Sequence, residues 1–346
     1  MAWPLGVLLA SGCAAGGDMG TTWGTPGVGP ASAGSVGPTG DEDEDEDDND
    51  AGAADAPSDE TFGGDDDDDD GMGDSTGGED PGPGDGADSG GDDEPPADPD
   101  PGFPAVASFD QPGPFSVTTR YNEGPGGAFA LHYPANVASS GFEHPILTWG
   151  NGTFAIPQYY AGLLEHLASH GFVVIASNST QTGSGMEMIE GMSWLIDQNA
   201  LGASEFYGAL DVDSIGSLGH SQGGGGSINA GGDPRVSTVV PIQPAPGNVS
   251  GLSGTMFVMS GGSDTIVSPG LVESLVYGPS NVPTFYGKLL GASHFEPVGD
   301  AGGYRGPITA WLRMELMGDV QAEALFIGDG CDLCTDPGWV TDRKNM

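Results

Sequence analysis

The chain reads SIGSLGHSQGGGG over residues 214–226, and this stretch indicates the fold. Ser221 lies between Gly219 and Gly223 in a G-x-S-x-G pattern, after a predicted strand and before a predicted helix. A nucleophile held in a sharp strand-to-helix turn needs small neighbours on both sides, which the two glycines provide. The start of a helix also favours developing negative charge, because its free N–H groups and its dipole point there. We therefore interpret Ser221 as a candidate nucleophile.

Strand and helix patterns alternate on both sides of this turn. An unbroken apolar run, typical of a strand buried on both faces, occurs at 172–177, and three more buried-type strands are expected at 236–242, 255–261 and 284–290. Further strands are expected at 114–121, 129–134 and 145–150, and helices at 160–170, 186–199 and 307–318, with a glycine-rich helix after the serine turn. This alternation predicts an α/β protein, with a mainly parallel central sheet and helices on both faces.

A serine nucleophile needs a base, and the base needs an orienting acid. In a G-x-S-x-G fold of this kind, the acid and then the histidine follow on loops after later strands. His294, in GASHFEP, is the only histidine after Ser221 and is therefore the predicted base. Asp264, in GGSDTIVSP, directly follows the preceding strand and is the predicted acid. The rival carboxylates stand in a turn, in a predicted helix or after the histidine: Asp233, Glu273, Glu296 and Asp300.

Two backbone donors are needed to stabilise an oxyanion. One is expected to be the N–H of Gln222, the residue after the nucleophile. The other is expected in the glycine-rich turn after the strand at 145–150, and we assign it to Thr153. Gly152 and Phe154 flank this donor and are expected to contact the substrate.

The five histidines other than His294 are expected to take no part in the reaction. His220 precedes the nucleophile and is expected to pack or to hydrogen-bond locally. The other four are expected at the surface or at helix ends: His132, His144, His166 and His170.

Cys331 and Cys334 form a C-x-x-C pair in a segment rich in Pro and Gly. A zinc site would need two more ligands nearby, and a redox pair would open a helix in a thioredoxin-like unit. We therefore expect a local disulfide, with little effect on stability because its loop is so short. No metal and no organic cofactor is expected.

The formal net charge of the 346 residues is −44, and it is unevenly distributed. Residues 1–100 hold 29 of the 51 acidic residues and no Lys or Arg. Such a polyanion repels phosphate backbones, which excludes nucleic acid as a partner. Residues 14–104, rich in Gly, Asp and Pro, contain too few apolar side chains to fold and are predicted to be a disordered linker. Residues 105–346 are predicted to form a single catalytic domain, which we expect to be monomeric.

The first 13 residues, MAWPLGVLLASGC, resemble the lipobox signal of bacterial lipoproteins. This resemblance implies that Cys13 is the lipidated residue and that the protein is exported and anchored to the outer membrane or cell surface. The alternative is a shortened start with a chance cysteine. No apolar run reaches the length of about 18 residues that a transmembrane helix requires.

The segments GHSQGG, GGSDTIVSP and GASHFEP, together with LLEHLASHGFVVIASNST, resemble the bacterial cutinase and poly(ethylene terephthalate) hydrolase group of the α/β-hydrolase superfamily. Dienelactone hydrolases, chlorophyllases and platelet-activating-factor acetylhydrolases are related. The resemblance spans about residues 110–345. It implies an α/β-hydrolase fold without a large lid domain and a serine esterase with Ser221, Asp264 and His294 as its triad.

Three positions depart from the polyester hydrolases of this group. Thr153 stands in place of an aromatic residue, Gln222 in place of Met, and Gly247 in place of a Trp that clamps the substrate. The sequence thus predicts an exported serine hydrolase of carboxylic esters that acts through an acyl-enzyme. The alternatives are a hydrolase of acyl-lipids or polyesters and, from another class, a catalytically silent surface binding lipoprotein.

Overall fold

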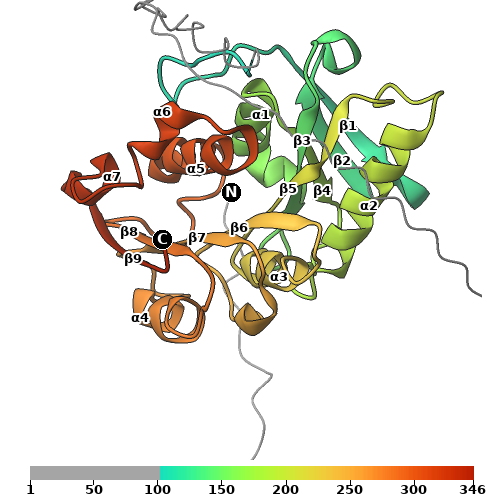
Figure 1. Cartoon of the computed structure of the whole chain (residues 1–346). Coiled ribbons are helices and arrows are strands. Elements are labelled where there is room, and N and C mark those ends of the chain that lie inside the picture. The colour runs from blue at the N-terminus through green and yellow to red at the C-terminus, as the bar shows by residue number, and fades with distance from the viewer. Residues whose placement is uncertain (1–101) are drawn as a thin grey trace, which may run out of the picture. The chain divides into compact units, whose positions relative to one another are not determined.

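Nine strands form one sheet in residues 102–346, the part of the chain that the computed structural model describes (Figure 1). Their order across the sheet is β1-β2-β4-β3-β5-β6-β7-β8-β9. The six strands from β4 to β8 run parallel, whereas β1, β2 and β9 pair antiparallel at the two ends. The strands are β1 Val117–Glu123, β2 Phe129–Pro134, β3 His144–Gly150, β4 Val173–Ser177, β5 Leu210–His220, β6 Val236–Ile242, β7 Thr255–Gly261, β8 Thr284–Leu289 and β9 Trp339–Lys344.

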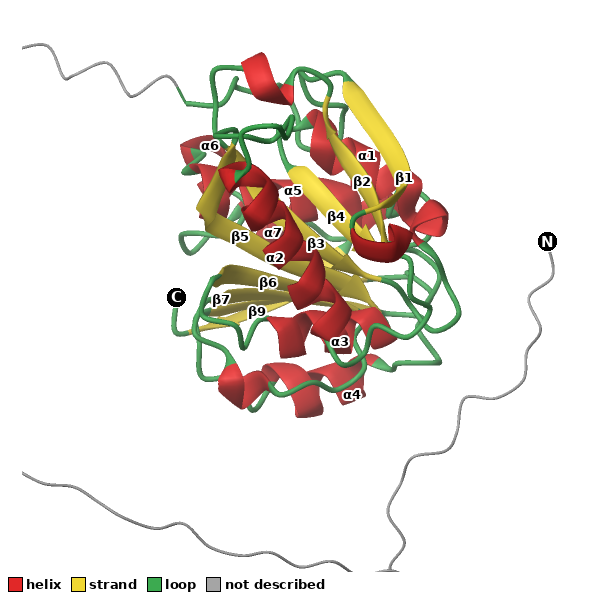
Figure 2. Ribbon diagram, turned by 90° about the vertical axis from the view of Figure 1, so that its right-hand side faces the viewer, coloured by secondary structure: helices red, strands yellow, loops and turns green. Residues whose placement is uncertain are grey.

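Helices cover both faces of this sheet, and each face has its own apolar core. Successive strand residues point to opposite faces, so Ile146 and Leu147 of β3 belong to different clusters. Helices α1 (Ala161–Ser169) and α5 (Arg305–Met317) pack on the Leu147 face. Helices α2 (Met186–Ala200), α3 (Gln222–Ala230) and α4 (Pro269–Val272) lie on the other face, where Figures 1 and 2 show α3 and α4 together. The predicted α/β architecture is therefore confirmed.

Shorter elements connect these layers. Two one-turn helices follow α5, namely α6 (Val320–Glu323) and α7 (Asp332–Thr335). Short 3-10 helices span Pro125–Gly127, Val137–Ser139, Pro157–Tyr160, Val249–Gly251 and Gly302–Tyr304, and a π-helical turn spans Glu273–Tyr277. No separate lid domain is present among residues 102–346.

The structure departs from the sequence prediction at three places. Strand β5 begins at Leu210, four residues earlier than predicted, and strand β9 was not predicted at all. The segment next to residue 104 also packs on the domain. The ring of Phe103 stacks on that of Phe142 with centroids 5.0 Å apart, and Arg313 Nη2 donates to the carbonyl of Pro104 at 3.0 Å.

The remaining predictions for the N-terminal region, the signal segment 1–13, Cys13 and the linker up to residue 101, lie outside the described residues. Within the described part of the chain, none of the helices combines the length and the apolar composition needed to span a membrane.

The glycines of α3 allow its backbone to pack directly against the backbone of neighbouring segments. A Cβ at Gly226 would overlap the carbonyl oxygen of Thr182, whereas a Cβ at Gly270 of α4 would meet nothing within 4 Å. We expect Gly226→Ala to lower the free energy of unfolding by about 1–3 kcal/mol, because backbone must move to admit the methyl group. For a domain of this size, that change corresponds to about 2–4 °C of Tm per kcal/mol.

The matched control is Gly270→Ala, which is expected to leave the Tm unchanged or to raise it slightly, since alanine restricts the unfolded chain. Equal Tm values for the two variants would contradict the close-packing interpretation.

Candidate active site

Four loops meet at the carboxyl edge of the parallel strands. They follow β3, β5, β7 and β8, and they carry Thr153, Ser221, Asp264 and His294 respectively. Strands β3 and β5 are neighbours, although β4 and α2 lie between them in the chain. An open α/β sheet places its site outside the carboxyl ends of its strands, which is where these loops lie.

Ser221 occupies a strained turn between β5 and α3. Its backbone has φ 57° and ψ −119°, a conformation that L-residues rarely adopt. Its N–H donates to the carbonyl of Ile242 at 3.0 Å, and its own carbonyl accepts from the N–H of Ala245 at 2.8 Å. These bonds fix the turn against the loop after β6, so that the side chain is presented at the sheet edge.

The two glycines of the G-x-S-x-G pattern are required by contacts with backbone. A Cβ at Gly219 would overlap the carbonyl oxygen of Gly223, and a Cβ at Gly223 would overlap that of Gly150. The sequence pattern and the close contact of β3, β5 and α3 thus have the same physical cause.

The structure brings Ser221, His294 and Asp264 together in one hydrogen-bonded line. His294 Nδ1 donates to Asp264 Oδ2 at 2.7 Å, since a carboxylate can only accept. With that proton on Nδ1, His294 Nε2 accepts from Ser221 Oγ at 3.0 Å. Asp264 is itself fixed, because its Oδ1 accepts from the N–H groups of Ile266 and Val267 at 2.8 and 2.9 Å. Asp264 and His294 are both buried.

The rival carboxylates are all engaged elsewhere. Asp233 pairs with Arg235 at 2.7 Å, and Asp300 pairs with Arg305 at 2.6 Å. The other two are hydrogen-bonded to groups other than His294. Glu273 accepts from the hydroxyl of Tyr286, and Glu296 accepts from the N–H of Gly303.

The loop after β3 lies beside the nucleophile. A Cβ at Gly152 would lie in ordinary contact with the Cβ of Ser221, at 3.6 Å, and only 2.9 Å from the hydroxyl of Tyr160, so a side chain there would crowd Tyr160. The backbone N–H groups of Thr153 and Gln222 donate to no partner in the described part of the chain. The N–H of Phe154, by contrast, donates to the carbonyl of Thr180 at 3.2 Å and is occupied.

Asn151 holds this loop in place, and the sequence reasoning did not single it out. Its amide nitrogen donates to the carbonyls of Ser177 and Ser179 at 2.6 and 3.0 Å, and its Oδ1 accepts from the indole N–H of Trp149. A polar residue between two glycines at a strand end was the available signal. Its complete burial appears only in the folded structure.

The expectation that four histidines lie at the surface or at helix ends is confirmed for the helix-end position of His166 and His170 and is wrong for His132 and His144. His132 and His144 are fully buried in β2 and β3, and His166 and His170 are buried at the end of α1. Burial lowers the pKa of His132 and of His170 to about 4, because desolvation disfavours the charged ring. The rings of His132 and His170 are therefore neutral at physiological pH and form part of the buried interior.

Cys331 and Cys334 are joined by a disulfide. Contrary to the sequence interpretation of an irregular tail, Cys331 caps the one-turn helix α7 at Asp332–Thr335. The pair leads into β9, which lies at the edge of the main sheet and not in a thioredoxin-like unit. Among residues 102–346, no group of three or more His, Cys, Asp or Glu side chains could hold a metal ion.

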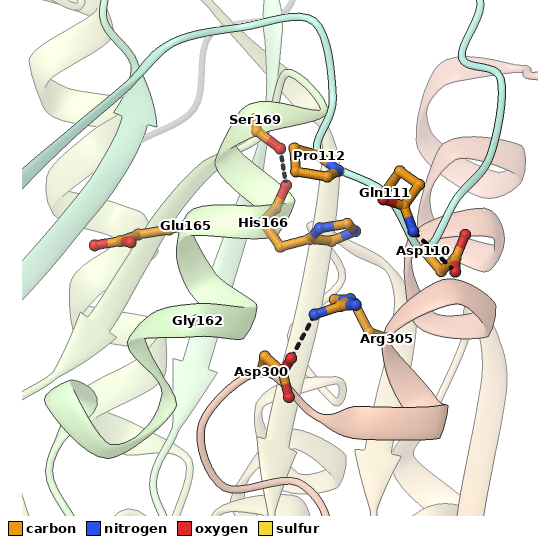
Figure 3. Close-up of a pocket in the computed structure, with 9 residues that line it drawn as sticks. All are labelled: Asp110, Gln111, Pro112, Gly162, Glu165, His166, Ser169, Asp300 and Arg305. Carbon is orange, nitrogen blue, oxygen red and sulfur yellow. Dashed lines mark hydrogen bonds and ion pairs between the residues drawn. The ribbon is translucent and has the colours of Figure 1, made fainter.

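A separate cavity of about 470 Å³ lies between α1 and the start of α5 (Figure 3). Figure 3 shows that the ring of His166 and the guanidinium of Arg305 approach each other in it, with Arg305 paired to Asp300. Ser221, His294 and Asp264 do not contribute to the wall of this cavity.

Comparison with known proteins gives a consistent picture. A family model described as PETase, PET hydrolase-like, matches residues 94–327. Cutinase est2 of Thermobifida alba is 28% identical over 199 residues, which cover 54% of this chain and 64% of the relative. Bis(hydroxyethyl) terephthalate hydrolase of Streptomyces coelicolor is 28% identical over 192 residues, which cover 53% and 59%. Cutinase 1 of Thermobifida cellulosilytica is 27% identical over 199 residues, which cover 54% and 73%.

The chain thus spans about three fifths of the length of the first two relatives it matches. The family model covers well over half of the chain, and its range includes all four of the loops that meet at Ser221. The sheet order and the strained serine turn agree with the α/β-hydrolase architecture that the sequence resemblance implied. The chain belongs to the PET hydrolase-like family.

Proposed function

We propose that this protein is a serine hydrolase of carboxylic esters. The observation that carries the proposal is the line from Ser221 Oγ through the His294 ring to Asp264, with contacts of 3.0 and 2.7 Å. In the proposed reaction, Ser221 Oγ attacks the ester carbonyl while His294 Nε2 takes its proton. His294 then gives that proton to the leaving alcohol. In the second half, it activates a water molecule that hydrolyses the acyl-enzyme.

Asp264 has an electrostatic and orienting role in this scheme. Its carboxylate keeps the proton of His294 on Nδ1, so that Nε2 faces the serine, and it stabilises the imidazolium that forms. The oxyanion is expected to be held by the free N–H groups of Thr153 and Gln222. The names of the relatives, cutinases and a bis(hydroxyethyl) terephthalate hydrolase, support ester chemistry. No step of this mechanism requires a metal or an organic cofactor.

The oxyanion assignment predicts the effect of removing one donor. Thr153→Pro deletes the N–H and is expected to lower kcat about 100- to 1,000-fold, the usual effect of losing one oxyanion donor. Thr153→Ala keeps the N–H and is expected to retain most of the activity. The measurement is the hydrolysis of p-nitrophenyl butyrate by both variants, with Tm as a check of folding. If the two variants were equally active, the donor would lie elsewhere.

A bulky apolar ester, such as an acyl-lipid or a polyester, is a second candidate substrate class. Large apolar side chains are exposed one or two residues after the oxyanion, acid and base positions: Phe154 is 66% exposed, Ile266 42% and Phe295 51%. An apolar rim of this kind favours a substrate that is itself apolar.

The subsite that would grip an aromatic polyester is different here. At Gly247, where polyester hydrolases carry Trp, a Cβ would lie 2.7 Å from both the carbonyl oxygen of Gly225 and the Cβ of Ile228. The loop is packed too closely on α3 for a tryptophan in the same backbone conformation. Gln222 stands in place of Met. Its side-chain nitrogen donates to Oε1 of Gln181, and its side-chain oxygen accepts from the N–H of Thr182. A panel of short-chain, long-chain and polymeric esters would separate the substrate classes.

A catalytically silent binding lipoprotein is the alternative from another class. A fluorophosphonate probe distinguishes the two, because it labels only an activated serine. Covalent labelling at Ser221 is expected, and its absence in the folded protein would favour the silent protein.

We also propose export and anchoring through Cys13. The disulfide between Cys331 and Cys334 supports an oxidising compartment. Globomycin-sensitive processing and incorporation of radiolabelled palmitate, both lost in Cys13→Ser, would test the anchor.

A further inference from the structure

Two sets of buried polar groups lie between the loop after β3 and the loop that carries His294. The N–H of Gly152 donates to the hydroxyl of Tyr160 at 3.2 Å, and this hydroxyl lies 2.9 Å from Nδ1 of His220. On the far side, Nε2 of Gln243 donates to the carbonyl of Ser293 at 2.8 Å, one residue before His294. None of these groups belongs to the triad, yet they touch the loops on both sides of it.

The direction of every bond in these two sets follows from which atoms can donate. Burial raises the pKa of Tyr160 to about 12, so its hydroxyl keeps its proton. Gly152 N–H can only donate to that oxygen, and Nδ1 of His220 is the acceptor within its reach in residues 102–346, so the hydroxyl proton goes to Nδ1 of His220. Burial, together with the neighbouring His294, lowers the pKa of His220 to about 3. The ring of His220 is therefore neutral and carries its single proton on Nε2.

The orientation of Gln243 is fixed in the same way. The carbonyl of Ser293 can only accept, so the amide nitrogen of Gln243 must face it, and this nitrogen also donates to the hydroxyl of Tyr304 at 3.2 Å. The carbonyl oxygen Oε1 then points to the other side. Gln243 is fully buried and has φ 46°, a rare conformation for a residue other than glycine.

Two buried atoms near the triad lack a partner within hydrogen-bond distance, and they are complementary. One is Nε2 of His220, which must carry a proton, and the other is Oε1 of Gln243, which must accept one. The backbone of His294 and, to a smaller extent, the Gln243 side chain act to raise the pKa of His220, as acceptors facing the ring do, so both the His294 loop and Gln243 lie beside this ring. Orphaned buried polar atoms are rare, so a donor and an acceptor left open in the same place point to a pair that closes.

We propose that Tyr160, His220 and Gln243 form a relay that positions the oxyanion loop and the His294 loop as one unit. This inference rests on the proposed ester hydrolysis, because the effect of positioning is measured as the rate of that reaction. The three residues touch no reacting atom. They are positioning residues, and the ring of His220 lies against that of His294 with centroids 4.7 Å apart.

The first test does not depend on activity. In protein labelled with ¹⁵N-histidine, the His220 resonance, assigned by its loss in His220→Gln, is expected to show the Nε2–H tautomer. It is expected to stay neutral between pH 5 and 8. A proton on Nδ1, or titration within that range, would overturn the relay. If the wild type hydrolysed no ester, the proposed function would fail while this result still decided the relay.

The second test is a double-mutant cycle on kcat. Tyr160→Phe and Gln243→Met are each expected to lower kcat about 10- to 100-fold while KM stays within about twofold, because small displacements of reacting groups act on the chemical step. The double variant is expected to lose no more than the worse single variant, since groups of one unit are not additive. Losses that multiply, or that appear in KM alone, would contradict the relay.

Tyr133→Phe is the matched control. Tyr133 is as buried as Tyr160, and its hydroxyl is also hydrogen-bonded, but to Glu205 at the other end of the sheet. It is expected to change the Tm without changing kcat. A similar loss of kcat in this variant would indicate that Tyr160→Phe acts through general destabilisation and not through positioning.

Discussion

Replacing Ser221 by alanine is expected to lower kcat for p-nitrophenyl butyrate by about 10⁴- to 10⁶-fold. The change removes one oxygen and leaves the Cβ, so the strained turn and its bonds to Ile242 and Ala245 have no reason to rearrange. The loss is large because, among residues 102–346, Ser221 carries the hydroxyl that is hydrogen-bonded to Nε2 of His294. The oxyanion donors remain and account for the residual rate over water.

The measurement is steady-state hydrolysis together with fluorophosphonate labelling, and both are expected to fail in this variant. Ser274→Ala is a suitable control, because its hydroxyl is hydrogen-bonded within the α4 segment and lies away from the site. If Ser221→Ala retained wild-type turnover, the proposed function would be wrong.

Replacing Asp264 by asparagine is expected to lower kcat about 10³- to 10⁴-fold. Oδ1 of the wild-type carboxylate accepts from Ile266 and Val267, so the asparagine oxygen is held there by the same two N–H groups. The amide nitrogen must then face Nδ1 of His294. It offers a proton where the carboxylate accepted one, and this favours the tautomer that has its proton on Nε2. Such a ring cannot accept the proton of Ser221.

Asp300→Asn is the matched control, since Asp300 also lies near His294 in the sequence but pairs with Arg305 at the surface. Activity near the wild-type value is expected for Asp300→Asn. The two variants should be compared at equal folded fraction. If Asp300→Asn were inactive and Asp264→Asn active, the acid of the triad would be Asp300.

The sequence was sufficient for the parts of the fold that carry local signals. The buried parallel strands appear in the sequence as largely apolar runs. The serine turn appears as glycines at fixed spacing, because local sterics alone require them. The three residues placed in line were found by a rule of chain order, which does not need coordinates. A unique histidine after Ser221 left little choice.

Features that depend on distant neighbours could not be predicted in this way. Strand β9 has a mixed pattern of exposure because it is an edge strand, and it follows a turn rich in polar residues. His132 and His144 look like surface residues in the sequence, and only the packing of other elements over β2 and β3 buries them. Gln243 carries no local signal at all. Its contacts come from residues about 50 to 60 positions away.

The close packing around Ser221 has a consequence for directed evolution. The surroundings of the nucleophile consist of backbone, at Gly219, Gly223 and Gly226, so almost any codon change there introduces atoms into occupied space. Tolerance to mutation should be lowest over 219–226. Thr153, Phe154 and Ile266 border the same centre with side chains that are at least partly exposed. Libraries that randomise these three codons and keep 219–226 constant should therefore contain the larger fraction of folded variants with altered substrate preference.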